Sequence, residues 1–68
     1  MNFVMTSEPN RFDVRKDGYD TYEIFDIETG RTVSVGGQPR AKLKLDEADA
    51  LVDMLNSGDQ EPDEQPTH

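Results

Sequence analysis

Residues 45–58 read LDEADALVDMLNSG, and this stretch decides the fold class. Its apolar residues recur at i, i+3, i+4 and i+7, which is the spacing of a helix with one apolar stripe. We predict that Asp46 is the N-cap, because its carboxylate can accept hydrogen bonds from the unpaired N–H groups of the first turn. Gly58 suits the left-handed position that ends a helix. The residues of the predicted stripe are Ala48, Leu51, Val52 and Leu55.

Residues 11–16 alternate between apolar and polar side chains, which is typical of a half-buried β-strand. Phe12 and Val14 share the apolar face of this strand. The pair Asp17-Gly18 follows and predicts a two-residue hairpin turn, since glycine tolerates the positive φ that such a turn requires.

The second strand is predicted over Tyr19–Ile27. Phe25 and Ile27 fall on the opposite face from Tyr22 and Ile24. Apolar residues on both faces leave three alternatives open: a strand covered on both sides, a bulge that exchanges the faces, or one face that contacts a partner.

Short connections join the remaining predicted elements. A turn over residues 28–30 leads to a third strand over residues 31–35, and the Gly-Gly-Gln-Pro run at 36–39 ends the sheet. Residues 40–45 alternate again, either as a short fourth strand or as an extended lead-in to the helix. The expected fold class is therefore α+β, with a three-stranded (alternatively four-stranded) antiparallel β-meander and one C-terminal amphipathic helix packed on one face.

The chain of 68 residues has room for one hydrophobic core and no second domain. We expect residues 1–10 to be irregular and residues 11–58 to form the single domain. Residues 59–68 contain no apolar side chain, so they cannot offset the entropy lost on ordering. This segment is predicted to be a disordered acidic tail.

Composition narrows the classes of function. The formal net charge of −8 repels nucleic-acid backbones and anionic lipid, so we expect no direct binding to nucleic acid or membrane. The chain has no cysteine, which excludes disulfides and thiolate zinc sites. No stretch approaches the roughly 18 apolar residues that span a bilayer, and no leader pattern is present. We expect a cytoplasmic protein.

No motif indicates catalysis or a cofactor. Nucleophilic catalysis needs a base beside the nucleophile, and the only histidine, His68, lies in the predicted tail. The run Asp26–Gly30 departs from a calcium-binding EF-hand loop, because its glycine comes at position 5 instead of 6. Gly36-Gly37 lacks the strand–GxxxxGK–helix context of a phosphate loop. We predict a non-enzymatic protein without a metal, cofactor or identifiable small-molecule ligand.

The segment from Tyr22 to Asn56 combines an aromatic strand, an Asp-x-x-Thr-Gly turn, a valine strand and a Leu-x-x-Ala-x-x-Leu-x-x-x-Leu-Asn helix. In this order it resembles a family of short alphaproteobacterial proteins of unknown function. The resemblance covers about half of the chain and implies a bacterial, cytosolic protein with no assigned activity. It carries over no functional residues.

Two hypotheses for the function follow. The first is a small protein-interaction module that is completed by a protein partner or by a second copy of itself as a homodimer. A hydrophobic content of only 32%, a strand that is apolar on both faces and uncovered sheet edges favour it. The second is an acidic regulator that mimics nucleic acid and docks onto a basic nucleic-acid-binding protein, which the net charge favours.

Two groups of residues form the candidate interaction surface. In the apolar group, Met54 beside the helix stripe either edges the core or contacts a partner. The basic group falls at period two on one side of an extended segment. It either binds an acidic partner or neutralises helix carboxylates in this chain or in a second copy. The candidates are Phe25, Ile27 and Met54 in the apolar group and Arg40, Lys42 and Lys44 in the basic group.

Overall fold

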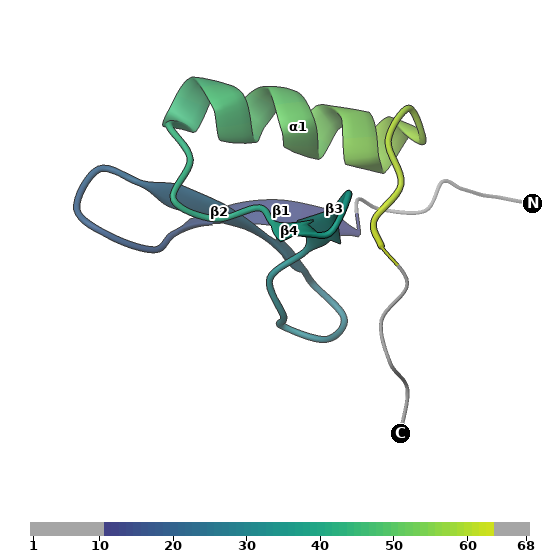
Figure 1. Cartoon of the computed structure of the whole chain (residues 1–68), viewed down its shortest axis with the longest axis horizontal. Helices are drawn as coiled ribbons and strands as arrows, with labels where there is room; N and C mark the ends of the chain where they lie inside the picture. Colours follow the sequence, from purple (N-terminus) through teal and green to yellow (C-terminus); the bar gives the residue numbers. More distant parts are fainter. Residues whose placement is uncertain (1–10, 64–68) are drawn as a thin grey trace, which may run out of the picture.

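The computed structural model describes residues 11–63 (Figure 1). It confirms an α+β fold, built from two antiparallel hairpins and one helix that lies across the sheet. The predicted irregular segment 1–10 lies outside the described residues. No helix within the described part of the chain is long and apolar enough to cross a membrane. The elements are β1 (Phe12–Lys16), β2 (Tyr22–Asp26), β3 (Ser34–Val35), β4 (Gln38–Pro39) and α1 (Leu45–Ser57).

Strand β2 lies in the middle of the sheet. It pairs with β1 along one edge. Along the other edge, the N–H of Ile24 donates to the C=O of Arg40 at 3.0 Å, and the N–H of Val33 donates to the C=O of Ile24 at 2.8 Å. Two separate segments, residues 31–33 and 40–43, therefore share this edge of β2, and the β3–β4 hairpin projects between them.

The predicted meander is therefore wrong at its third strand. Residues 31–35 do not run on as one strand, because the chain leaves β2 after Val33 and folds into the β3–β4 hairpin. Gly36 and Gly37 make this possible with φ angles of 63° and 83°. Such angles suit a two-residue hairpin turn and are accessible to glycine without strain. The segment 40–43 then completes the third position instead of adding a fourth strand.

The predicted start of β2 is also wrong. This strand begins at Tyr22, because β1 and β2 are joined by a loop over residues 17–21 and not by a two-residue turn. The Asp17 carboxylate accepts hydrogen bonds from the Thr21 hydroxyl at 2.6 Å and from the Lys42 N–H at 2.7 Å. These bonds stabilise the wider loop.

Helix α1 begins at Leu45, so Asp46 lies within the first turn and is not the N-cap that we predicted. The N-cap is Lys44, whose backbone N–H donates to the Glu47 carboxylate at 3.3 Å. A carboxylate three residues into the helix thus satisfies the N–H of the capping residue, as in a capping box. The predicted end is confirmed, because Gly58 adopts a left-handed φ of 89°.

The core lies between α1 and one face of the sheet. Leu51 and Val52 of the predicted stripe are partly buried against it. The face of β2 that carries Tyr22 and Ile24 is covered by the helix side, whereas Phe25 belongs to the opposite face. The buried apolar residues are Phe12, Ile24, Val33, Val35, Ala48 and Leu55.

Asn56 ties the end of α1 to the outer edge of β1. Its Oδ1 accepts hydrogen bonds from the N–H groups of Arg11 at 3.1 Å and Phe12 at 3.0 Å, and its Nδ2 donates to the C=O of Phe12 at 3.1 Å. A side-chain amide offers the same donor and acceptor as a peptide group. Asn56 therefore takes the place of a neighbouring strand and covers this part of the sheet edge.

The described part of the chain extends beyond Gly58. The N–H of Asp63 donates to the C=O of Ser34 at 2.7 Å, which fastens residues 59–63 to the β3–β4 hairpin. We call residues 59–63 the strap. The predicted disorder of residues 59–68 stays a prediction, and residues 64–68 lie outside the described residues.

Candidate functional site

Four large apolar side chains are exposed on the described part of the chain. Tyr19 is the most exposed at 91%, followed by Ile27 at 50%, Leu45 at 47% and Met54 at 41%. A tyrosine ring combines a large apolar body with a hydroxyl, and such rings are enriched among the residues that dominate protein interfaces. Tyr19 is therefore the starting point for a candidate site.

Tyr19 and Leu45 lie at the same end of the molecule. Figure 1 shows the β1–β2 loop beside the beginning of α1. Lys42 joins the two, because its N–H and its Nζ donate to the Oδ2 and the C=O of Asp17 at 2.7 and 3.2 Å. We define the Tyr19 surface as the exposed residues Tyr19, Lys42, Lys44 and Leu45.

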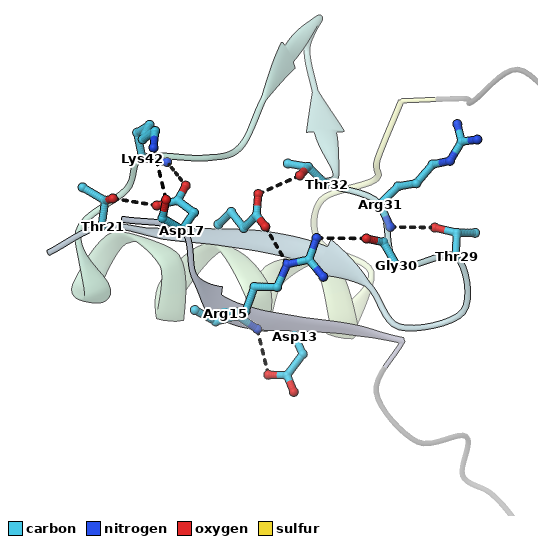
Figure 2. Close-up of polar contacts among 11 residues, drawn as sticks. Asp13, Arg15, Asp17, Thr21, Thr29, Gly30, Arg31, Thr32 and Lys42 are labelled. Atoms are coloured by element: carbon cyan, nitrogen blue, oxygen red, sulfur yellow. Dashed lines mark hydrogen bonds and ion pairs between the residues drawn. The ribbon is translucent and has the colours of Figure 1, made fainter. Parts of the chain in front are cut away.

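The loop that carries Tyr19 is held in one position by Asp17. Its carboxylate binds both the Thr21 hydroxyl and the Lys42 N–H, as Figure 2 shows. The hydrogen bond from Thr21 is the main cause of a lowered Asp17 pKa, and the bond from Lys42 adds to it. Lys42 adopts a φ of 57°, which is uncommon for a side-chain-bearing residue. A Cβ at Gly18 would lie 2.6 Å from the Thr21 hydroxyl, so this close packing requires glycine.

The sheet face turned away from α1 is covered by its own side chains. The Arg15 guanidinium lies over the Phe25 ring, 4.3 Å from its centroid. Arg15 also donates to the Glu23 carboxylate at 2.5 Å and to the C=O of Gly30 at 2.9 Å, as Figure 2 shows for Gly30. The Thr32 hydroxyl donates to the other Glu23 oxygen at 2.7 Å. Phe25 is therefore half-buried within a single copy of the chain.

Two carboxylates stabilise the ends of β2. Hydrogen bonds from Thr32 and Arg15 lower the pKa of Glu23. Asp26 is only 4% exposed. Burial raises its pKa, but the hydrogen bonds from Arg11 and from the Glu28 N–H outweigh burial, and the net shift of the Asp26 pKa is downward. The Glu23 and Asp26 carboxylates both make hydrogen bonds within the chain and stabilise the fold.

The structure does not bring the apolar candidates together. Phe25 lies beneath Arg15 on the sheet face away from the helix, whereas Met54 is on α1. Ile27 follows the end of β2, and its N–H donates to the C=O of Arg11 at 2.8 Å. Ile27 and Met54 are both exposed, Ile27 directly after the end of β2 and Met54 on α1.

The basic candidates also separate. The positive φ of Lys42 interrupts the extended segment, so the period-two alternation does not continue through it. Arg40 is half-buried and donates to the C=O of Val35 at 2.9 Å. Lys42 and Lys44 remain exposed and belong to the Tyr19 surface.

Sequence reasoning missed both apolar members of this surface. Tyr19 was assigned to a strand, although Gly18 and Asp20 on either side of it are typical of a loop. Leu45 falls in the segment predicted as either a short fourth strand or a lead-in to the helix, whereas it is the first residue of α1. The flanking turn residues were a usable signal for Tyr19.

Charge is divided unevenly along the described part of the chain. Residues 11–44 carry seven bases and six acids, for a net charge of +1, whereas residues 45–63 carry seven acids and no base, for −7. Within residues 11–63, no group of three or more histidine, cysteine, aspartate or glutamate side chains is placed to hold a metal ion. The helix layer is therefore the acidic side of the molecule.

No protein-family model matches this chain, and no curated protein or solved structure matches it either. The resemblance to short alphaproteobacterial proteins stays a prediction. The choice of a candidate surface therefore rests on exposure, hydrogen bonding and charge.

Proposed function

We propose that this chain is a small non-enzymatic protein-interaction module that binds its partner through the Tyr19 surface. The observation that carries the proposal is a tyrosine that is 91% exposed on a loop fixed by Asp17. A loop whose backbone is already held by hydrogen bonds loses little backbone entropy on binding, which favours affinity. The aromatic ring supplies the large contact area that interface centres require.

The composition of the Tyr19 surface indicates the chemistry of the partner. Tyr19 and Leu45 need an apolar recess, and Lys42 and Lys44 favour carboxylates at its rim, because complementary charge directs association. The partner is either a different protein with such a carboxylate-rimmed recess or a second copy of this chain. Helix α1 of a second copy would supply four acids and no base.

Site-specific photo-crosslinking tests the proposal directly. A photoreactive phenylalanine analogue replaces Tyr19 in the full chain, and the matched control carries it at Thr29, an exposed residue of the β2–β3 turn. We expect one discrete adduct from position 19 that is absent from position 29 and is lost on Leu45→Asp. Equal adducts from both positions, or an adduct that survives Leu45→Asp, would contradict the proposal.

Light scattering on the full chain distinguishes the two kinds of partner. A molar mass of twice the monomer, falling on a hundredfold dilution, would identify a second copy as the partner. Tyr19→Ser is then expected to give a monomer at every concentration, because it removes the ring from the interface. A wild-type chain that is monomeric at every concentration would show that the partner crosslinked at position 19 is a different protein.

A second candidate is the acidic mimic of nucleic acid. It is supported by the exposed carboxylates of α1 on an ordered helix that lacks any base: Asp46, Glu47, Asp49 and Asp53. Such a regulator would bind a basic protein with a steep dependence on salt. Asp49→Asn together with Asp53→Asn would then weaken binding, whereas Tyr19→Ser would leave it unchanged.

A further inference from the structure

The turn of the β3–β4 hairpin holds a carboxylate. One oxygen of Asp63 accepts the N–H of Gly36 at 3.0 Å, and the other accepts the N–H of Gly37 at 2.7 Å. The Asp63 N–H in turn donates to the C=O of Ser34 at 2.7 Å. Successive backbone N–H groups in a turn form a concave site that favours anions. Both the acid and its main chain are therefore recognised.

Arg40 adds a positive charge to the same hairpin. Its guanidinium donates to the C=O of Val35, and its Nη2 would lie 3.9 Å from a Cβ placed on Gly36. The Arg40 Nε is buried and has no hydrogen-bond partner among residues 11–63. An arginine next to two N–H donors strengthens the preference of the turn for a negatively charged group.

The segment that delivers Asp63 is held by polar contacts. The strap contains no aliphatic, aromatic or sulfur-containing residue of the hydrophobic set, and the Gln60 N–H donates to the C=O of Met54 at 3.1 Å. Hydrogen bonds between exposed groups are readily exchanged for bonds to water, with a small net change in free energy. Another carboxylate can therefore replace Asp63 without exposing the core.

We propose that the Gly36–Gly37 turn is a binding site for an aspartate-bearing extended segment of a partner protein, and that Asp63 occupies it as a built-in competitor. The site is separate from the Tyr19 surface, because the hairpin lies away from the β1–β2 loop (Figure 1). The inference therefore goes beyond the proposed function and stands or fails independently of it.

The geometry defines the ligand more closely than charge alone. The residue that supplies the carboxylate to Gly36 and Gly37 also supplies the N–H to Ser34. An aspartate side chain spans this separation, while glutamate is one methylene longer. A free anion such as acetate has no main-chain N–H and leaves the C=O of Ser34 unsatisfied. Aspartate within an extended peptide is therefore the preferred ligand.

The test uses the full chain with Asp63→Asn, which empties the turn of its carboxylate while keeping the size of the side chain. The probes are a synthetic peptide of residues 59–68, matched peptides with asparagine or glutamate in place of Asp63, and sodium acetate. The amide resonances of Gly36 and Gly37 in NMR spectra report on the site, because a bound carboxylate shifts both amide protons. The glutamate peptide keeps the full negative charge and so controls for charge, while the asparagine peptide keeps the size of the side chain and removes only its charge.

We expect Asp63→Asn to shift both glycine amides, and the aspartate peptide to return them towards their wild-type positions. The asparagine and glutamate peptides and acetate should bind at least about tenfold more weakly. The wild-type chain should also require about tenfold more peptide or more, because a tethered competitor acts at an effective concentration near millimolar.

Three results would overturn the inference. Unchanged glycine amides in Asp63→Asn would show that the carboxylate is not in the turn. Equal binding of the aspartate and asparagine peptides, or no binding at millimolar peptide, would show that the turn does not select aspartate in trans. Unfolding of Asp63→Asn, seen as loss of helical circular dichroism, would show that the strap is a structural fastening and not a replaceable ligand.

Discussion

Asp17 shows how one side chain positions a candidate binding surface. Its carboxylate joins the β1–β2 loop to the segment before α1 through Thr21 and Lys42. Neither contact is visible in the local sequence, where Asp17-Gly18 is typical of a tight turn. The residue types at 17 and 18 were informative, but the partner that decides the loop lies 25 positions further along the chain.

Removing this carboxylate should loosen the loop that carries Tyr19. In Asp17→Ala, the Lys42 N–H loses its acceptor, and we expect its hydrogen exchange to accelerate by about tenfold or more, since local opening governs exchange. Exchange is measured by NMR at neutral pH. Asp20→Ala, in the same loop, is the matched control and should leave the Lys42 amide unchanged; equal acceleration in both variants would contradict the role given to Asp17.

Asp26 and Glu23 predict how stability depends on pH. Both have pKa values that are lowered in the folded chain from their ordinary values of 3.8 and 4.5. A carboxyl with a lower pKa in the folded state stabilises the fold above its unfolded pKa and loses that contribution as pH falls through the folded one. The free energy of unfolding should therefore be level near neutrality and decline below about pH 4.5.

Asp26→Asn should remove part of this acid dependence. It weakens the contact with Arg11, and a hydrogen bond to a charged group contributes about 1.5–3 kcal/mol. We expect a loss of about 1–2 kcal/mol near neutral pH, at the low end because Arg11 is largely exposed. Urea denaturation at pH 7 and pH 3 measures it. A variant with wild-type stability at pH 7, or with an unchanged fall between the two values, would contradict this assignment.

At the scale of elements, local periodicity predicts the regular elements. Features that depend on tertiary contacts could not be predicted from the sequence. The helix stripe and the alternation in β1 repeat over several residues, so the sequence alone predicts both elements. The prediction of the third strand was wrong because Gly36-Gly37 continues the chain into a hairpin. The turn of this hairpin is bound by Asp63, which lies far along the sequence. The helix start moved because Glu47, within the helix, pairs with the Lys44 N–H. Of the candidate surface, Lys42 and Lys44 were predicted, whereas Tyr19 and Leu45 required the structure.

The attachment of α1 to β1 predicts a specific loss of stability. Asn56→Ala removes the acceptor of the Phe12 N–H and the donor to its C=O, and leaving a buried backbone group unpaired costs about 1–3 kcal/mol. Urea denaturation should show a loss in this range. Asp49→Asn, an exposed change on the same helix, is the control and should stay within about 0.5 kcal/mol of wild type. Similar losses of unfolding free energy in the two variants would show that Asn56 does not hold α1 against β1.

At the scale of the whole molecule, a small core coexists with an exposed aromatic residue on a hydrogen-bonded loop. Within residues 11–63, six apolar residues form the buried core beneath helix α1. On the sheet face away from α1, Arg15 covers Phe25, and the most exposed large apolar side chain is Tyr19 on the β1–β2 loop. Residues 11–44 carry a net charge of +1 and residues 45–63 a net charge of −7, so most of the negative charge of the described chain belongs to α1 and the strap.

The affinity of the chain for the partner captured at position 19 tests the central claim most directly. Isothermal titration calorimetry compares wild type, Tyr19→Ser and Ile27→Ser, the last being a matched loss of an exposed apolar side chain outside the Tyr19 surface. We predict that Tyr19→Ser weakens binding by about thirtyfold, or roughly 2 kcal/mol, and that Ile27→Ser changes it by less than about twofold. Binding that is unaffected by Tyr19→Ser, or weakened equally by Ile27→Ser, would contradict the account.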